Sequence, residues 1–145
     1  MSSNRLPVLA SNIQRAIAEA DKASALAAAK AIEAGEALVE AKELANHGEW
    51  LPFLKQAGIN ERTAQRYMRL AKARLSSDTV SHLGLTGALR FIRLRELACG
   101  QLAEAEAAAR EGRTGYDELV PLETAILLMD EMVAMFPPDL LEGRA

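Results

Sequence analysis

The stretch with the most evident chemistry runs from Asn60 to Arg74, NERTAQRYMRLAKAR, and carries five basic side chains against one acidic one. The whole chain of 145 residues, by contrast, has a formal net charge of −3. An arginine can donate two parallel hydrogen bonds to guanine O6 and N7, a glutamine can pair similarly with adenine, and lysines bind phosphates. A helical period would place five long polar side chains of this stretch on one face: Arg62, Gln65, Arg66, Arg69 and Lys72.

This arrangement favours a DNA-binding helix. We expect four side chains to read base edges: Arg62, Gln65, Arg66 and Arg69. We expect phosphate contacts from five other basic residues: Lys55, Lys72, Arg74, Arg90 and Arg93. For the arginines after residue 89 a second interpretation is open, in which they neutralise acidic neighbours. A charged helix face that is merely solvated is the alternative for the whole stretch. Against it, nine basic and two acidic residues between Lys55 and Arg95 give this window a charge of +7 and leave −10 for the rest.

Two short helices joined by a tight turn must position these side chains. The segment EWLPFLKQA, residues 49–57, predicts a short amphipathic helix with a proline in its first turn. In the following GIN, Gly58 can take the left-handed conformation, Ile59 can fill the angle between the helices and Asn60 is a good N-cap. The second helix is expected over Glu61–Arg74, with an apolar side formed by Ala64, Tyr67, Met68 and Ala71. This order of elements is typical of a helix-turn-helix.

A long alanine-rich helix is expected before this pair. Ser11 and Gln14 form a capping box at its start, and Asn46-His47-Gly48 is a suitable end. Gly35, inside it, indicates either a kink or a division into two helices. Small and apolar residues recur at a spacing of three and four, which favours a helical hairpin or a coiled-coil seam between chains. Packing of this helix on its own domain is the alternative. The residues concerned are Ile13, Ile17, Ala20, Ala27, Ala31, Ala34, Leu38, Ala41 and Ala45.

The region from Gly35 to about Ala73, roughly a quarter of the chain, resembles a family of bacterial, phage and plasmid proteins known as a domain of unknown function. The pattern of that family, L.EAK....HG.W followed by tA.rYM.lA, is matched at His47-Gly48-Glu49-Trp50 and at Thr63-Ala64-Gln65-Arg66-Tyr67-Met68. The resemblance implies a helical, DNA-binding-like module that is often found on mobile elements. It does not supply a known activity.

The rest of the chain is expected to form supporting helices. Ser76 or Ser77 can cap a short helix, and Thr86 can cap a second one that carries the later arginines. Pro121 suits the first position of a last helix, which Pro137-Pro138 should stop. That helix is rich in methionine and has two adjoining apolar stripes, which must be buried in the fold or against a second copy. A less common interpretation of such methionine-rich stripes is that they form a groove for a protein partner. One stripe is Leu122, Ile126, Met129, Val133 and Phe136, and the other is Ala125, Leu128, Met132 and Met135.

Signals for catalysis, metal binding or membrane insertion are not found in the sequence. His47 and His82 are the only histidines and form no i, i+4 pair, and Cys99, the only cysteine, is expected to be a buried, inert thiol. There is no glycine-rich phosphate loop, and no apolar run approaches the roughly 20 residues needed to cross a bilayer. We expect no catalytic activity, no cofactor, no membrane association and a cytoplasmic location.

The sequence thus predicts an all-α protein in three parts: an N-terminal helical segment over residues 1–47, a helix-turn-helix over 48–75, and a C-terminal helical support or dimerisation region over 76–145. The predicted function is binding of double-stranded DNA by a homodimer, as a transcriptional regulator or a phage or plasmid maintenance protein. A symmetric pair would place two half-sites about 34 Å apart. The alternative is a helical oligomeric adaptor, as in phage DNA packaging, with nonspecific DNA binding or none.

Overall fold

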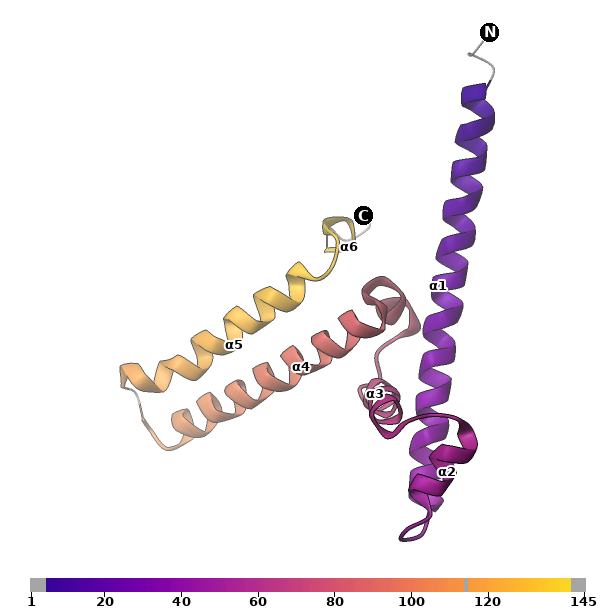
Figure 1. Cartoon of the computed structure of the whole chain (residues 1–145). Coiled ribbons are helices and arrows are strands. Elements are labelled where there is room, and N and C mark those ends of the chain that lie inside the picture. The colour runs from indigo at the N-terminus through magenta and orange to yellow at the C-terminus, as the bar shows by residue number, and fades with distance from the viewer. Residues whose placement is uncertain (1–4, 114, 142–145) are drawn as a thin grey trace. The chain divides into compact units, whose positions relative to one another are not determined.

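The computed structural model describes residues 5–113 and 115–141, and within them it contains helices and no strand (Figure 1). The all-α class is therefore confirmed, as is the long N-terminal helix. The chain divides into two compact units, Met1–Ser81 and His82–Ala145, which are described separately.

Helix α1, Arg5–Leu44, is one helix of 40 residues and is roughly 60 Å long at 1.5 Å per residue. It begins before Ser11, so the predicted N-cap at Ser11 is wrong. Pro7 is tolerated because a proline in the first turn removes an N–H that has no acceptor within the helix. Because the alanine-rich sequence that follows has high helix propensity, the helix can begin before Ser11 and continue through it.

Gly35 neither kinks α1 nor divides it, so both alternatives offered by the sequence are wrong. The residue is buried where α1 crosses α3, Glu61–Lys72. A Cβ atom at Gly35 would lie 2.2 Å from the Tyr67 carbonyl oxygen and 2.8 Å from the Ala71 Cβ. Glycine is therefore needed here for the close approach of two helix backbones rather than for a bend.

The core of the first unit lies where α1, α2 and α3 meet. Helix α2, Trp50–Ala57, follows the C-terminal end of α1 and contributes Leu54, which is 2% exposed. Trp50 stacks on Phe53 with ring centroids 5.8 Å apart, and the Lys42 Nζ lies 5.4 Å from the Trp50 ring centroid. These contacts fix α2 against the end of α1. The core comprises Leu38, Leu54, Ala64 and Met68, with Val39, Trp50, Ile59 and Tyr67 packed around it.

Helix α4, Ser77–Arg110, begins in the first unit, and most of it belongs to the second. Ser76 caps it, because the Ser76 Oγ accepts a hydrogen bond of 3.2 Å from the Thr79 amide. The helix is interrupted at Gly84, whose φ of 69° and ψ of 170° are non-helical. The expected second start at Thr86 is therefore replaced by a break two residues earlier. The break lies at a glycine because these φ and ψ values are essentially closed to other residues.

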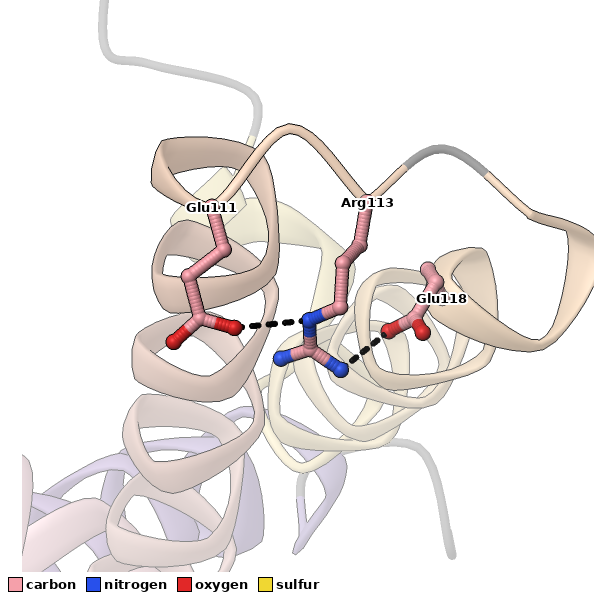
Figure 2. Close-up of polar contacts among 3 residues, drawn as sticks. All are labelled: Glu111, Arg113 and Glu118. Carbon is pink, nitrogen blue, oxygen red and sulfur yellow. Dashed lines mark hydrogen bonds and ion pairs between the residues drawn. The ribbon is translucent and has the colours of Figure 1, made fainter.

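The second unit is a helical hairpin in which α5, Tyr116–Ala134, returns beside α4 (Figure 1). An ion pair between Arg90 and Glu131 joins the two helices, and the Phe91 and Phe136 rings meet edge to face at 5.6 Å. At the connection, the Arg113 Nε donates to Glu111 at 2.8 Å and its Nη1 donates to Glu118 at 2.9 Å (Figure 2). The negative charge of Glu118, and then that of Glu111, raises the pKa of Arg113 above its usual value.

Helix α5 starts five residues before Pro121, so the predicted first position at Pro121 is wrong. Asp117 and Glu118 in the first turn favour the earlier start, because acidic side chains stabilise the positive end of the helix dipole. The helix stops at Ala134, ahead of the two prolines as predicted, and Pro138 opens the short α6, Pro138–Leu141.

The two apolar stripes of α5 have different surroundings. Ala125 is buried, and the other members of its stripe are half-buried. In the second stripe Phe136 is half-buried, whereas Leu122, Ile126, Met129 and Val133 remain exposed. The hairpin thus covers one side of α5 and leaves an apolar stripe on the other.

Candidate nucleic-acid interface

The turn between α2 and α3 is built by local interactions of three consecutive residues. Gly58 ends α2 in the left-handed conformation with a φ of 72°. The Ile59 amide donates to the Leu54 carbonyl at 3.1 Å, and the Ile59 side chain packs against the core. The Asn60 Oδ1 accepts a hydrogen bond of 2.8 Å from the Thr63 amide and so caps α3. The predicted break between two helices at residues 58–60 is confirmed.

Helix α3 has a sharply divided surface. Its inner side contains Ala64 at 0% exposure, Met68 at 5% and Leu70 at 1%. The sequence interpretation missed Leu70, although it lies three residues after Tyr67 and therefore at the edge of the predicted apolar side. The five predicted polar residues are exposed on the rest of the helix, and we call them the basic face: Arg62, Gln65, Arg66, Arg69 and Lys72.

The C-terminal end of α3 differs from the prediction. The helix ends at Lys72, two residues before the expected Arg74. Arg74 has a φ of 54°, and its amide donates to the Ala71 carbonyl at 3.2 Å. A left-handed residue just after a helix redirects the chain. Arg74 therefore leaves the line of the basic face, although it remains exposed.

An open groove separates the end of α3 from α1, and its two walls have opposite charge. Lys72 and Arg74 line one wall. The other is lined by three glutamates of α1 at i, i+4 and i+7, which we call the acidic stripe: Glu36, Glu40 and Glu43. Their spacing could have been read from the sequence, because these positions share one helix face. The negative charge of the acidic stripe disfavours the approach of an anion to this end of α3.

The remaining predicted phosphate ligands are distributed over both units. Lys55 is exposed on α2, next to the turn, where it borders a shallow groove with Gly58 and Asn60. Arg90 and Arg93 are exposed on α4 in the second unit, whereas α3 belongs to the first. Arg90 is ion-paired with Glu131, which agrees with the interpretation that this arginine neutralises an acidic neighbour.

The described ranges, residues 5–113 and 115–141, also bear on metal, thiol and membrane chemistry. They contain no group of three or more histidine, cysteine, aspartate or glutamate side chains placed to hold a metal ion. Cys99 is exposed, so the expectation of a buried thiol is wrong. Among the helices of these residues, none combines the length and apolar character needed to cross a membrane.

Comparison with known proteins extends the similarity well beyond α2 and α3. Neither the curated proteins nor the solved structures contain a match to the chain. The match to a protein family runs from residue 6 to residue 104, so it includes nearly all of α1, both short helices and most of α4, but not α5. Because this range is more than half of the chain, the protein belongs to the family described as "Protein of unknown function (DUF3102)".

Proposed function

We propose that the protein binds double-stranded DNA through the basic face of α3. The observation that carries this proposal is the exposure of four cationic side chains and one glutamine along one side of a capped helix that is held by its opposite side. A helix of this kind fits the major groove, where arginine and glutamine side chains can distinguish base pairs.

The roles of individual residues follow from their positions. Arg62, Gln65, Arg66 and Arg69 read base edges, because they occupy the N-terminal and middle turns of the exposed face. Phosphates are bound by the residues at its borders, Lys55 beside the turn and Lys72 at the end of α3. Arg74 is a weaker phosphate ligand, because the chain turns away before it.

The cellular role that best fits such a surface is that of a transcriptional regulator or a maintenance protein of a phage or plasmid, acting as a two-fold dimer. A single short helix reads only a few base pairs, and a symmetric pair doubles the site. The resemblance of residues 35–73 to proteins of bacteria, phages and plasmids supports a role on mobile elements.

A pair of substitutions tests the proposed roles. Arg66→Ala should cost about 1–3 kcal/mol on the preferred DNA site and relax selectivity at one base position, because a bidentate base contact is lost. Lys72→Ala should weaken binding to all sequences alike and reduce the salt dependence by about one phosphate contact. Binding would be measured against a selected genomic site and a scrambled duplex at several salt concentrations.

A matched control removes an arginine from the other unit. Arg110→Ala also deletes one exposed positive charge, but from α4, where Arg110 is ion-paired with Glu106, and DNA affinity should not change beyond the small effect of net charge. If Arg66→Ala and Lys72→Ala both bind like the unmodified protein, with helicity intact by circular dichroism, the basic face does not contact DNA.

A helical adaptor is the second candidate, and the exposed stripe on α5 favours it. Leu122, Ile126, Met129 and Val133 form an apolar surface that another protein could cover. The ratio of specific to nonspecific DNA affinity separates the two candidates. A regulator should prefer its site by about 10³-fold or more, whereas an adaptor should show no such preference.

A further inference from the structure

The N-terminal half of α1 extends beyond the core of its own unit. Every side chain from Arg5 to Ser24 is exposed. Ser24, at the end of this half, accepts a hydrogen bond of 3.0 Å from the Ser81 hydroxyl. This half nevertheless contains large apolar residues, among them Leu6 at 68% exposure and Ile13 at 57%. The described residues of the unit therefore leave the apolar side of this half of α1 uncovered.

The apolar residues follow the spacing of a coiled coil. Positions 6, 9, 13 and 16 advance by three, four and three residues, as the a and d positions of two heptads do. Ile17 lies at the border of the same side. We call this surface the α1 seam: Leu6, Leu9, Ile13 and Ala16.

We propose that a second copy of this chain covers the α1 seam, with the two helices antiparallel and overlapping over residues 5–19. In this register Leu9 packs against Ile13 of the second copy, and Leu6 packs against Ala16. Each of these contacts occurs twice because the pair is symmetric. The overlap ends before Ser24, so the second copy does not collide with the contact between α1 and Ser81.

The charges beside the seam favour the antiparallel arrangement. Antiparallel helices bring g positions together, and this register sets Arg5 of each copy against Glu19 of the other. In a parallel pair, Arg5 would face Ala10 and Glu19 would face Ser24, so no ion pair would form. Self-complementary charge of this kind identifies a second copy as the occupant.

The exposed stripe of α5 does not have this property. Helix α5 contains acidic residues and no lysine or arginine. Pairing two copies of α5 would bring Glu118, Glu123 and Asp130 near their own counterparts, which is repulsive. The α1 seam is therefore the better surface for a second copy.

The proposed pairing sets the distance between the two α3 helices. The centre of the overlap lies near residue 11 or 12, about 24 residues from the crossing at Gly35, which corresponds to roughly 35 Å along the helix. The two crossings are therefore roughly 70 Å apart, which equals about two turns of B-form DNA. The expected separation of the two DNA half-sites, which rests on the proposed function, is therefore twice the one-turn separation of the simplest symmetric dimer.

Both α3 helices also lie on one side of the pair. At about 100° per residue, Gly35 is displaced by roughly 60° around α1 from the middle of the seam. A two-fold axis perpendicular to both α1 helices carries that displacement to the same side in the second copy. One face of a duplex could therefore meet both basic faces.

The association is tested first without DNA. By sedimentation at tens of micromolar the unmodified chain should be dimeric, and Ile13→Lys should raise the dissociation constant by about 100-fold or more, since two buried isoleucines are lost per dimer. Leu26→Lys is the matched control, because Leu26 is an exposed leucine of the same helix outside the overlap. A monomeric unmodified chain, or equal effects of the two variants, overturns the proposal.

The direction of pairing is tested by the distance between spin labels. The label is attached at Ala29→Cys in a Cys99→Ser background, which removes the exposed natural cysteine. An antiparallel pair should give a label separation of roughly 50 Å, and a parallel pair one of roughly 10–20 Å. The short distance would overturn the proposed arrangement.

A charge exchange tests the register. Glu19→Arg alone should weaken association by about tenfold, because two ion pairs become repulsive contacts. The double variant Arg5→Glu with Glu19→Arg should restore it. Failure of the double variant to recover any affinity would show that these residues do not face each other.

A final measurement separates this inference from the proposed function. Duplexes carrying two copies of the preferred half-site are compared at spacings from 8 to 24 base pairs, and binding should be tightest near 20–21, two helical turns. A dimer with the long label distance that binds no DNA would contradict the proposed function and leave the pairing intact. A chain that binds DNA specifically but stays monomeric would contradict the pairing and the dimeric state, and would leave DNA binding by the basic face intact.

Discussion

Gly35 shows how one residue controls the position of the basic face. Replacing Gly35 by alanine adds a Cβ atom that would lie 2.2 Å from a backbone oxygen of α3, so one helix must move. We expect Gly35→Ala to lower the free energy of unfolding by about 1–3 kcal/mol, the usual cost of overpacking, even though alanine has the higher helix propensity. Urea unfolding followed by the fluorescence of Trp50, the only tryptophan, measures this change.

The control uses a glycine in a different environment. A Cβ at Gly100, inside α4, would meet no atom within 4 Å. Gly100→Ala should therefore stabilise the chain by about 0.4–1 kcal/mol, measured by circular dichroism. If both substitutions stabilise, α1 and α3 are not in backbone contact at Gly35.

At the scale of the element, the acidic stripe of α1 should tune the affinity of α3. Glu36 and Glu40 line the same groove as Lys72, and exposed charges act on one another over a Debye length of about 10 Å at 0.1 M salt. Glu36→Gln with Glu40→Gln should raise DNA affinity several-fold at low salt, and the gain should shrink as salt increases. Titrations at low and high salt measure it.

The corresponding control is a double change of glutamates remote from the groove. Glu104→Gln with Glu123→Gln alters the net charge by the same amount in the second unit. An equal gain from both double variants would mean that net charge, and not the acidic stripe, governs the affinity.

The elements also show which features a single sequence can predict. Gly58 acts through its own backbone, and Asn60 acts through a side-chain hydrogen bond to Thr63, so the break between α2 and α3 followed from local chemistry. The exposed side of α3 followed from periodicity. Gly35 was misinterpreted because its role depends on Tyr67, 32 residues away, and no local signal announces a helix crossing.

Helix boundaries were the other source of error. Ser11 and Pro121 are both suitable starting residues, yet α1 and α5 begin before them. Such a residue marks the start of a helix only where the residues before it are not helical. The residues before Ser11 and before Pro121 are helical. The left-handed Arg74 was missed for a related reason, because only glycine and asparagine signal that conformation reliably.

For the whole molecule, the division into two units should be visible in unfolding. Trp50 and its neighbours report only on Met1–Ser81, whereas the far-ultraviolet circular dichroism signal reports on both helical units. We expect the two urea transitions not to coincide, which is the established sign that unfolding is not two-state. Gly35→Ala should shift the fluorescence transition to lower urea and leave the later part of the dichroism transition in place.

Coincident transitions for both probes, shifted together by Gly35→Ala, would contradict this prediction. They would mean that the two units unfold as one cooperative body. Gly100→Ala again serves as the comparison, because it should move the dichroism transition and not the fluorescence.

Helix α1 is packed along its C-terminal half only, and this has a consequence for its behaviour on warming. Starting a helix is unfavourable, with a nucleation constant of about 10⁻³, whereas extending an existing helix gains a hydrogen bond with each residue. The packed turns from Ala28 to Leu38 provide the nucleus, and the exposed half persists by propagation from them. Fraying therefore advances inward from Arg5 as temperature rises. In a chain without a second copy the residues of the α1 seam therefore melt first, and the helix shortens while the core around Leu54 is still folded.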